Sequence, residues 1–306
     1  MIDIKETYLG FLERDNQLTK PVAAIQALLA LLCELQPNTS AEMIDILQDA
    51  ANTLKSSVSN SISLSAGCDL FLRFLTKNIN ASKDWDACRR NLVQNGNLFA
   101  SRALDARSNI ARIGLPFVRD HDTILVHGRS RAVIQLLQDA AMSNSVRFRV
   151  YITEARVCNE GVYMANILKK SGIPVCVVPD CSVGYVIDHT DKVFIGAEGV
   201  AESGGVINQI GSYQVAMLAK AANKPVYVFA ESHKFVRMFP VSPSDLPGNE
   251  KLEFTSPVHP ESIEMNLEAW PQVDFTPHQY ITALVTDLGV LTPSGVSEEL
   301  IKMWFD

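Results

Sequence analysis

Three short segments of the chain combine residue types that could bind or transform a small molecule. The first is His127-Gly128-Arg129-Ser130-Arg131, which places a glycine, a hydroxyl and two guanidinium groups where a helix is expected to begin. Backbone N–H groups at a helix N-terminus and charged guanidinium groups both suit a phosphate. A solvated basic turn in which Ser130 only caps the helix explains the same residues. The sequence leaves both interpretations open.

The second segment is rich in glycine and carries three polar candidates. Five glycines lie between positions 196 and 211, together with Glu198, Asn208 and Gln209. This spacing indicates backbone that turns sharply or approaches a ligand closely, although glycine can equally serve the shape of a loop. The order of residues matches neither the dinucleotide-binding glycine motif nor a P-loop. We therefore expect a loop here, with or without a ligand.

The third segment is Glu231-Ser232-His233-Lys234-Phe235. His233 and Lys234 could face the same cleft, but a histidine beside a lysine is more often a surface residue. The chain shows no Ser/His/Asp order and no zinc-binding His-Glu-x-x-His pattern. Nucleophilic hydrolysis and zinc chemistry therefore have no support in the sequence.

These segments each follow a predicted strand in the second part of the chain, residues 121–306. Short runs rich in β-branched residues alternate there with helical stretches, most of them at the spacing of a βαβ unit. The apolar runs are continuous, which indicates strands covered on both faces of a parallel sheet. We predict a doubly wound, Rossmann-like domain, whose ligands bind beyond the carboxyl ends of the strands. The predicted strands are Thr123–His127, Phe148–Ile152, Val175–Val178, Lys192–Ile195, Val226–Phe229 and Ala283–Thr286.

The first part of the chain, residues 1–120, is predicted to form an all-helical domain. Apolar residues recur at helical spacing through Val22–Leu35, Met43–Leu54, Leu64–Leu75 and from Trp85 onward. Thr39-Ser40-Ala41-Glu42 has the pattern of a capping box at a helix start. The fold class is thus α/β, a helical domain followed by the Rossmann-like one. The proline-rich Val241–Pro277 shows no period and is predicted to be a long surface excursion.

Composition excludes several classes of function. The chain of 306 residues carries a net charge of −7 and no basic run, so direct binding of nucleic acid is not expected. Its six cysteines include no Cys-x-x-Cys pair, which favours a reducing compartment without disulfides or zinc. The longest apolar stretch, Val22–Leu35, is too short to span a bilayer. We expect a soluble cytosolic protein without a membrane partner.

Three motifs together resemble a known family. They are Ile195–Val200, Gly205–Tyr213 and Thr286–Pro293, and the likeness extends over nearly the whole chain. The family comprises the alpha, beta and delta subunits of translation initiation factor 2B and two enzyme relatives, the methylthioribose-1-phosphate and ribose-1,5-bisphosphate isomerases. The resemblance implies a helical domain ahead of a Rossmann-like one.

The resemblance also implies that isomerase chemistry is lost. The family's enzymes use a cysteine after the first strand and an aspartate after the fourth, where this chain has Gly128 and Glu198. Their phosphate-binding lysine after Asn208 is replaced by Gln209. Moving a proton between carbons needs an acid and a base at fixed positions. We expect no enzyme activity and no required cofactor, but a pocket in which Arg129 and Arg131 could still hold a sugar phosphate or nucleoside monophosphate.

Among the noncatalytic members, the alpha subunits resemble the chain best. This likeness implies a regulatory subunit of the guanine nucleotide exchange factor for translation initiation factor 2. The implied partners are a second copy of the chain, the beta, delta, gamma and epsilon subunits, and the phosphorylated alpha subunit of factor 2. The implied contact for that phosphorylated partner is the helix start with Thr39, Ser40 and Glu42. An independent sugar-phosphate-binding protein and a residual isomerase stay open as alternatives.

Overall fold

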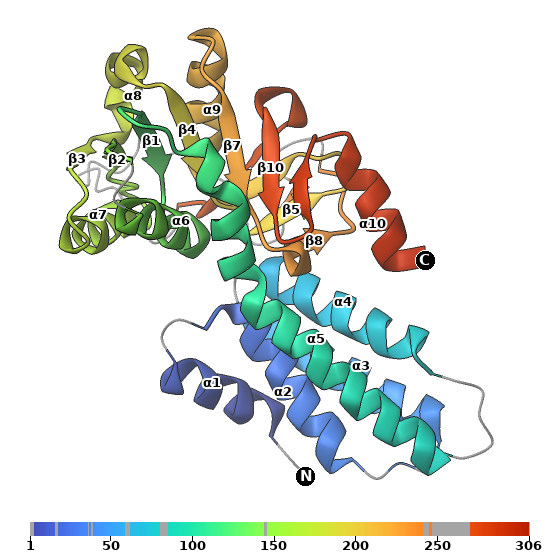
Figure 1. The fold of residues 1–306 in the computed structure, drawn as a ribbon. Coiled ribbons are helices and arrows are strands. Elements are labelled where there is room, and N and C mark those ends of the chain that lie inside the picture. The colour runs from blue at the N-terminus through green and yellow to red at the C-terminus, as the bar shows by residue number, and fades with distance from the viewer. Residues whose placement is uncertain are drawn as a thin grey trace, which may run out of the picture.

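The computed structural model describes residues 3–15, 18–35, 37, 39–58, 62–79, 85–143, 146–240, 245–246 and 270–305. Five helices come first, and two β-sheets with their covering helices follow (Figure 1). This arrangement confirms the predicted fold class. Within these residues, no helix has the length and apolarity required to cross a membrane.

The four predicted helical stretches are all present, as α2 to α5, and a further helix, α1, precedes them. Their bounds are α1 Ile4–Arg14, α2 Lys20–Glu34, α3 Ser40–Ser56, α4 Ile62–Lys77 and α5 Trp85–Gly114. α3 begins as the capping pattern predicts, because the Thr39 hydroxyl accepts the N–H of Glu42 at 3.2 Å. α2 is the central helix, with one apolar stripe against α4 and others against α1, α3 and α5.

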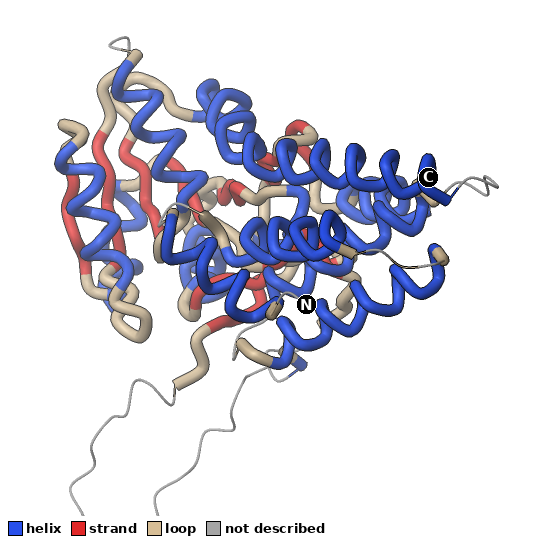
Figure 2. The backbone as a smooth tube through the Cα atoms, turned by 90° about the horizontal axis from the view of Figure 1, so that it is seen from below, coloured by secondary structure: helices blue, strands red, loops and turns tan. Residues whose placement is uncertain are grey.

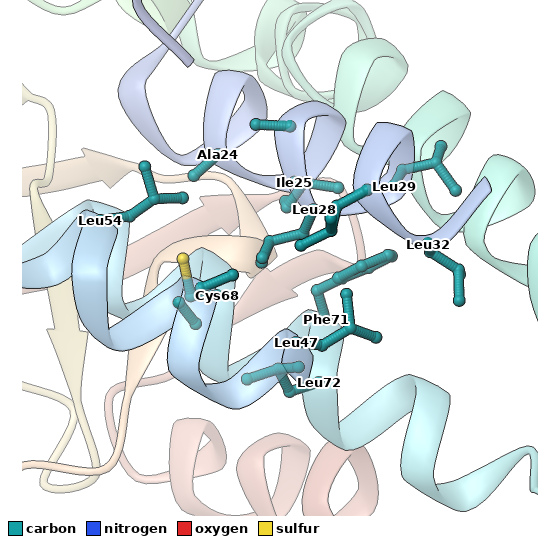
Figure 3. Close-up of a cluster of buried hydrophobic side chains, with 14 of the residues drawn as sticks. Ala24, Ile25, Leu28, Leu29, Leu32, Leu47, Leu54, Cys68, Phe71 and Leu72 are labelled. Atoms are coloured by element: carbon teal, nitrogen blue, oxygen red, sulfur yellow. The ribbon is translucent and has the colours of Figure 1, made fainter. Parts of the chain in front are cut away.

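The core of the helical region is built mainly from aliphatic side chains. Ile25, Leu28 and Leu32 of α2 are fully buried and meet Leu47 of α3 and Phe71 of α4 (Figure 3). Each stripe needs the others to be covered, since an isolated amphipathic helix gains little stability in water. The helices therefore form one packed bundle.

The larger sheet has seven strands in the order β11-β10-β7-β4-β1-β2-β3. All neighbouring pairs are parallel except β10–β11. All six predicted strands are confirmed, with only the second displaced by one residue. The strands are β1 Thr123–His127, β2 Arg149–Thr153, β3 Val175–Val178, β4 Lys192–Ile195, β7 Val226–Phe229, β10 Ala283–Thr286 and β11 Gly289–Leu291.

Helices cover both faces of this sheet, as the continuous apolar strands predict (Figure 2). α6 Arg131–Met142, α7 Glu160–Lys170 and the end of α5 pack on one face. α8 Val183–Val186, α9 Ser212–Ala221 and α10 Gly295–Phe305 pack on the other. Short 3₁₀ turns complete the connections, at Leu115–Phe117, Asp180–Ser182, Ile187–His189, Ser232–Lys234 (η4) and His278–Tyr280.

A second sheet of four strands replaces the loop expected in the glycine-rich segment. Its order is β8-β5-β6-β9, with β5 Gly199–Ala201, β6 Val206–Gln209, β8 Phe235–Val236 and β9 Val273–Thr276. The loop prediction was wrong because these strands are short and pair mostly with distant parts of the chain. β9 also corrects the prediction for Val241–Pro277, most of which lies outside the described residues.

The second sheet lies between the Rossmann-like core and the helical bundle. One face turns Val206 and Phe235 into the core of the larger sheet. The opposite face packs Ile207 and Phe275 against Ile62 of α4. Alternating side chains of single strands thus join two cores.

α5 provides a second connection between the two parts of the chain. Over its 30 residues it contributes Leu92 and Ala103 to the helical core, and Ile110 and Ala111 to the larger sheet (Figure 1). The boundary predicted at residue 120 falls just after this helix, between η1 (Leu115–Phe117) and β1. One rigid helix therefore belongs to both cores.

Candidate functional site

A cavity of about 690 Å³ opens at the carboxyl ends of β1 and β4. These neighbouring strands are where the order of the parallel strands reverses, the usual binding position in such sheets. The helical region supplies one wall, through Leu12, the connection to α2 and the start of α4. The wall includes six of the eight predicted pocket residues: Arg129, Ser130, Arg131, Glu198, Asn208 and Gln209.

The two predicted arginines have different surroundings. The guanidinium of Arg129 forms an ion pair with Glu160 at 3.1 Å and lies 4.3 Å from the centre of the Tyr163 ring. Arg131 is half-buried, and burial followed by repulsion from Arg129 and Arg107 lowers its pKa. Repulsion between cations favours the approach of an anion, so Arg131 is the stronger candidate for holding one.

Ser130 is the N-cap of α6, which was one of the two interpretations left open by the sequence. Its hydroxyl accepts the N–H of Val133 at 3.3 Å, which fixes the first turn of α6. A Cβ on Gly196 would lie only 2.7 Å from the Ser130 Cβ, so glycine is required where β4 ends against this turn. The α6 N-terminus therefore lies directly over the end of β4, with its positive dipole end at the cavity.

A buried ion pair follows β7. Lys234 Nζ lies 2.9 Å from Glu231 and donates to the carbonyl of Ala197, also at 2.9 Å. Burial alone raises the pKa of Glu231, but Lys234, His233 and hydrogen bonds outweigh it and hold that pKa at about 2. Both residues of the pair line the cavity, which the sequence indicated only for Lys234.

Asp287 positions this segment without lining the cavity. Its carboxylate accepts the backbone N–H of Ser232 at 2.7 Å and the Ser232 hydroxyl at 2.8 Å. These bonds attach the turn that carries Glu231 and Lys234 to the end of β10. The motif Thr286–Pro293 signalled this residue, although its role is structural.

Gly128 and Gln209 fit together so closely that each restricts the other. Gly128 has a φ of +68°, and a Cβ there would meet Oε1 of Gln209 at 2.1 Å. That same oxygen accepts the N–H of Arg129 at 3.1 Å. Gln209 therefore fixes the loop after β1, while Gly128 itself does not line the cavity.

The two histidines lie away from the cavity. His127, 2% exposed, bridges the Thr153 hydroxyl at 2.7 Å and the Ile210 carbonyl at 2.9 Å, and burial lowers its pKa. These bonds connect β1 with β2 and with the segment before α9. His127 does not line the cavity, contrary to the prediction. The surface position expected for His233 is wrong, because it is 3% exposed beside a buried ion pair.

Glu198, which stands where the resemblance places the aspartate of the enzymes, lines the cavity. Its backbone N–H donates to the carbonyl of Ile207, which places the residue at the junction of β4 and the second sheet. Cys158 also lines the cavity, where burial and then Glu160, Glu198 and Asp180 raise the pKa of its thiol. This thiol stays protonated at neutral pH and donates to Gln272 Oε1 at 3.2 Å.

A buried carboxylate that the sequence did not indicate, that of Asp274, lies on the strand next to Asn208. β6 and β9 pair Asn208 with Asp274, so the two side chains lie on one face of the second sheet. Asp274 accepts the N–H groups of Gly211 and Tyr213, at 2.7 and 3.1 Å, and thereby caps α9. Burial outweighs these bonds and raises the pKa of Asp274 to about 7.

The helical wall adds polar groups that sequence reasoning missed. Thr19, the N-cap of α2, is 6% exposed, and its hydroxyl has no hydrogen-bond partner among the described residues. Lys20 and Pro21 begin the helix beside it, and Ser63 lies in the first turn of α4. Only the fold brings these helix starts to the strand ends. Among the described residues, no group of three or more His, Cys, Asp or Glu side chains is arranged to hold a metal.

The predicted partner contact lies outside this cavity. Thr39 and Glu42 are exposed at the start of α3, and Ser40 is half-buried. The cap is present, and a contact by the same residues stays a prediction.

Comparison with known proteins gives one consistent family. Residues 15–293 match the model of the initiation factor 2 subunit family. The translation initiation factor eIF2B subunit alpha of Dictyostelium discoideum is 38% identical, over 96% of this chain and 94% of its own length. That of Caenorhabditis elegans is 34% identical, over 98% of both. The ribose 1,5-bisphosphate isomerase of Methanocaldococcus jannaschii is 28% identical, over 89% of this chain and 85% of its own.

Two solved structures share the fold. The Pyrococcus horikoshii OT3 translation initiation factor eIF-2B aligns with a TM-score of 0.71 at 23% identity, over 96% of this chain and 98% of that one. A chain of the tetrameric eIF2B-beta2-delta2 complex from C. thermophilum aligns with a TM-score of 0.77 at 18% identity, over 98% of this chain and 94% of that one. Both include the helical region and the sheets.

The contact between Gly128 and Gln209 predicts an unequal effect of two glycine substitutions. Gly128→Ala and Gly172→Ala both place a Cβ on backbone with positive φ, but only the first meets a neighbour within 4 Å. We expect Gly128→Ala to lower the free energy of unfolding by about 1 kcal/mol more, because the Arg129–Gln209 hydrogen bond must break. Urea denaturation measures both. The excess should disappear in a Gln209→Ala background, and an excess that persists there would contradict the account.

The raised pKa of Asp274 predicts a pH-dependent stability. Because the folded state holds this proton more tightly than the unfolded chain, the stability it contributes is complete at low pH. It is lost as pH rises from about 4 through about 7. Asp274→Asn keeps the acceptor oxygen without the buried charge, so it should become more stable than wild type by on the order of 2–4 kcal/mol at pH 8. Thermal denaturation from pH 5 to pH 8 tests this, with the exposed Asp105→Asn as control. An equal pH response in wild type and Asp274→Asn would contradict it.

Proposed function

The chain belongs to the initiation factor 2 subunit family, and on that premise we propose that it is a regulatory, noncatalytic subunit of the guanine nucleotide exchange factor for translation initiation factor 2. The similarity to two alpha subunits over nearly the full length of every chain is the observation that carries this proposal. The isomerase relatives are similar at lower identity and over less of the chain. The proposed location is the cytosol.

The contents of the cavity support a role without isomerase activity. Gly128 offers no side chain where the resemblance implies a catalytic cysteine, and its place is closed by Gln209. Glu198 supplies a carboxylate. The thiol of Cys158 also lines the cavity, but it donates to Gln272 and lies in the loop after β2, whereas Gly128 lies in the loop after β1. Proton transfer between adjacent carbons requires both groups at defined positions, and displacement by an ångström is costly. We infer that the acid and base of the enzymes are not reconstituted here.

The cavity is nevertheless suited to an anionic ligand. Arg131, Lys234, Lys20 and the N-termini of α2 and α6 all face it, and the Thr19 hydroxyl is buried without a partner in the described chain. Helix N-termini and guanidinium groups favour phosphate, while Glu198 and Asn208 suit sugar hydroxyls. We propose a sugar phosphate or nucleoside monophosphate as a regulatory ligand, with no cofactor required.

The proposed partners follow from the same family membership. They are a second copy of the chain, then the beta and delta subunits, with gamma and epsilon completing the exchange factor. The C. thermophilum structure named for a beta–delta tetramer supports association between chains of this fold. Recognition of the phosphorylated alpha subunit of factor 2, with Thr39, Ser40 and Glu42 at the contact, is part of this proposal.

Association with the other subunits tests the proposed function directly. We expect the purified chain to have a mass of twice 33.7 kDa by light scattering and to co-elute with recombinant beta and delta subunits in gel filtration. A chain that elutes separately from them at micromolar concentration would favour an independent small-molecule-binding protein.

Calorimetry tests the proposed ligand. Ribose 5-phosphate and AMP should release heat on binding, whereas ribose and adenosine should not, because the charged phosphate supplies the affinity. Arg131→Gln should weaken phosphate binding about tenfold or more, and Arg102→Gln, on the exposed face of α5, should leave it unchanged. An absence of heat with every phosphate at millimolar concentration would contradict the ligand proposal.

A further inference from the structure

The chain between β2 and α7, residues 154–159, forms one wall of the cavity, and we refer to it as the β2–α7 turn. Cys158 of this turn lines the cavity, as does Glu160, the first residue of α7. Two contacts join this wall to its surroundings. The Cys158 thiol donates to Gln272 at 3.2 Å, and Glu160 forms its ion pair with Arg129 at 3.1 Å. The position of the turn therefore determines how closely the cavity is walled on the side of β2.

The backbone of the β2–α7 turn is strained at two positions. Ala155 and Asn159 have φ of +48° and +52°, in the left-handed region that residues other than glycine rarely adopt. They enclose one tight turn, because the Ala155 carbonyl accepts the N–H groups of Cys158 and Asn159, at 3.1 and 2.7 Å. Strain of this kind persists only where surrounding groups hold the backbone in place. The turn therefore needs an attachment that opposes its relaxation.

Asp180 provides this attachment from the neighbouring strand. Its two carboxylate oxygens accept the N–H groups of Ala155 and Arg156, each at 2.9 Å. Asp180 lies two residues after β3, which pairs with β2 at one edge of the larger sheet (Figure 1). Hydrogen bonds to a carboxylate are stronger than those between neutral groups, and successive N–H groups in a turn suit an anion. Asp180 does not line the cavity, so it can act on a ligand there only through the turn.

We infer that Asp180 is a positioning residue for the proposed ligand, because it holds the β2–α7 turn closed and thereby sets Cys158 and Glu160 in the cavity wall before the ligand binds. This inference rests on the phosphate ligand of the proposed function. When the carboxylate is lost, strain at Ala155 favours an open turn, and the binding-competent state is populated for only part of the time. The apparent dissociation constant then rises by the inverse of that fraction. By linkage, a bound ligand must favour the closed turn by the same factor.

Amide hydrogen exchange on the full-length chain, followed by mass spectrometry, tests the position of the turn. In Asp180→Asn, an amide replaces one acceptor oxygen, and we expect the N–H groups of Asn159 and Gly161 to exchange about tenfold faster or more. These two groups donate to carbonyls of the turn and not to Asp180. Exchange in β4 and α9 should stay at the wild-type rate. Asp188→Asn removes the same charge from an exposed residue and, as the matched control, should leave exchange in the turn unchanged.

Ribose 5-phosphate separates positioning from a purely structural role. We expect Asp180→Asn to raise its dissociation constant about fivefold or more in calorimetry. A saturating concentration should slow exchange in the turn, in wild type and in the variant, because the ligand selects the closed state. Asp180→Glu keeps the charge but displaces the carboxylate by one methylene. It should show the same changes at smaller size, and it decides the question if Asp180→Asn does not fold.

The outcomes distinguish this inference from the proposed function. Unchanged exchange in the turn of both variants, an unchanged dissociation constant, or faster exchange that saturating ribose 5-phosphate does not slow would each overturn the role of Asp180 and leave the ligand proposal intact. An absence of heat with wild type would overturn the ligand proposal, and with it the role of Asp180 in binding.

Discussion

The antiparallel pairing of β6 with β9 is the constraint on which the cavity depends. It holds a sheet of four short strands between the strand ends of the larger sheet and α4, and it sets Asn208 opposite Asp274. Together with α5, this sheet fixes the distance between Arg131 and the helical wall with Thr19 and Ser63. One face of the second sheet packs in the core of the larger sheet, and the other face packs against α4. The same packing therefore positions the cavity wall and the helical region.

Charge within the cavity is arranged in compensated pairs. Arg129 forms an ion pair with Glu160, and Lys234 forms one with Glu231. Removing these charges from water costs free energy, and the attraction within each pair offsets that cost. Arg131, Lys20 and Glu198 are the other charged groups of the wall. The loops are fixed by Gln209, which lines the cavity, and by Asp274 and Asp287, which do not line it.

Much of the fold could be predicted from sequence, because the Rossmann strands are continuous apolar runs with strong β-propensity, as in Val226–Phe229. The second sheet could not be predicted, because its glycines indicate turns rather than strands. Its contacts are also distant in sequence: Asp274 accepts the N–H of Gly211, which lies 63 residues away. Arg131, Glu198 and Asn208 could be predicted at the cavity, because they lie in segments that follow predicted strands. Position after a strand misplaced His127, whose ring turns inward to Thr153, and it carried no information about Thr19 and Lys20, which only the packing of α2 brings there.

We propose that the cavity has kept its architecture without a working acid–base pair. Incubation of the purified chain with ribose 1,5-bisphosphate, followed by NMR detection of the ketose product, tests it most directly, with the M. jannaschii enzyme as positive control. The account predicts no conversion above the uncatalysed rate. Conversion at an enzymatic rate by the wild-type chain, abolished in Glu198→Gln, would contradict it.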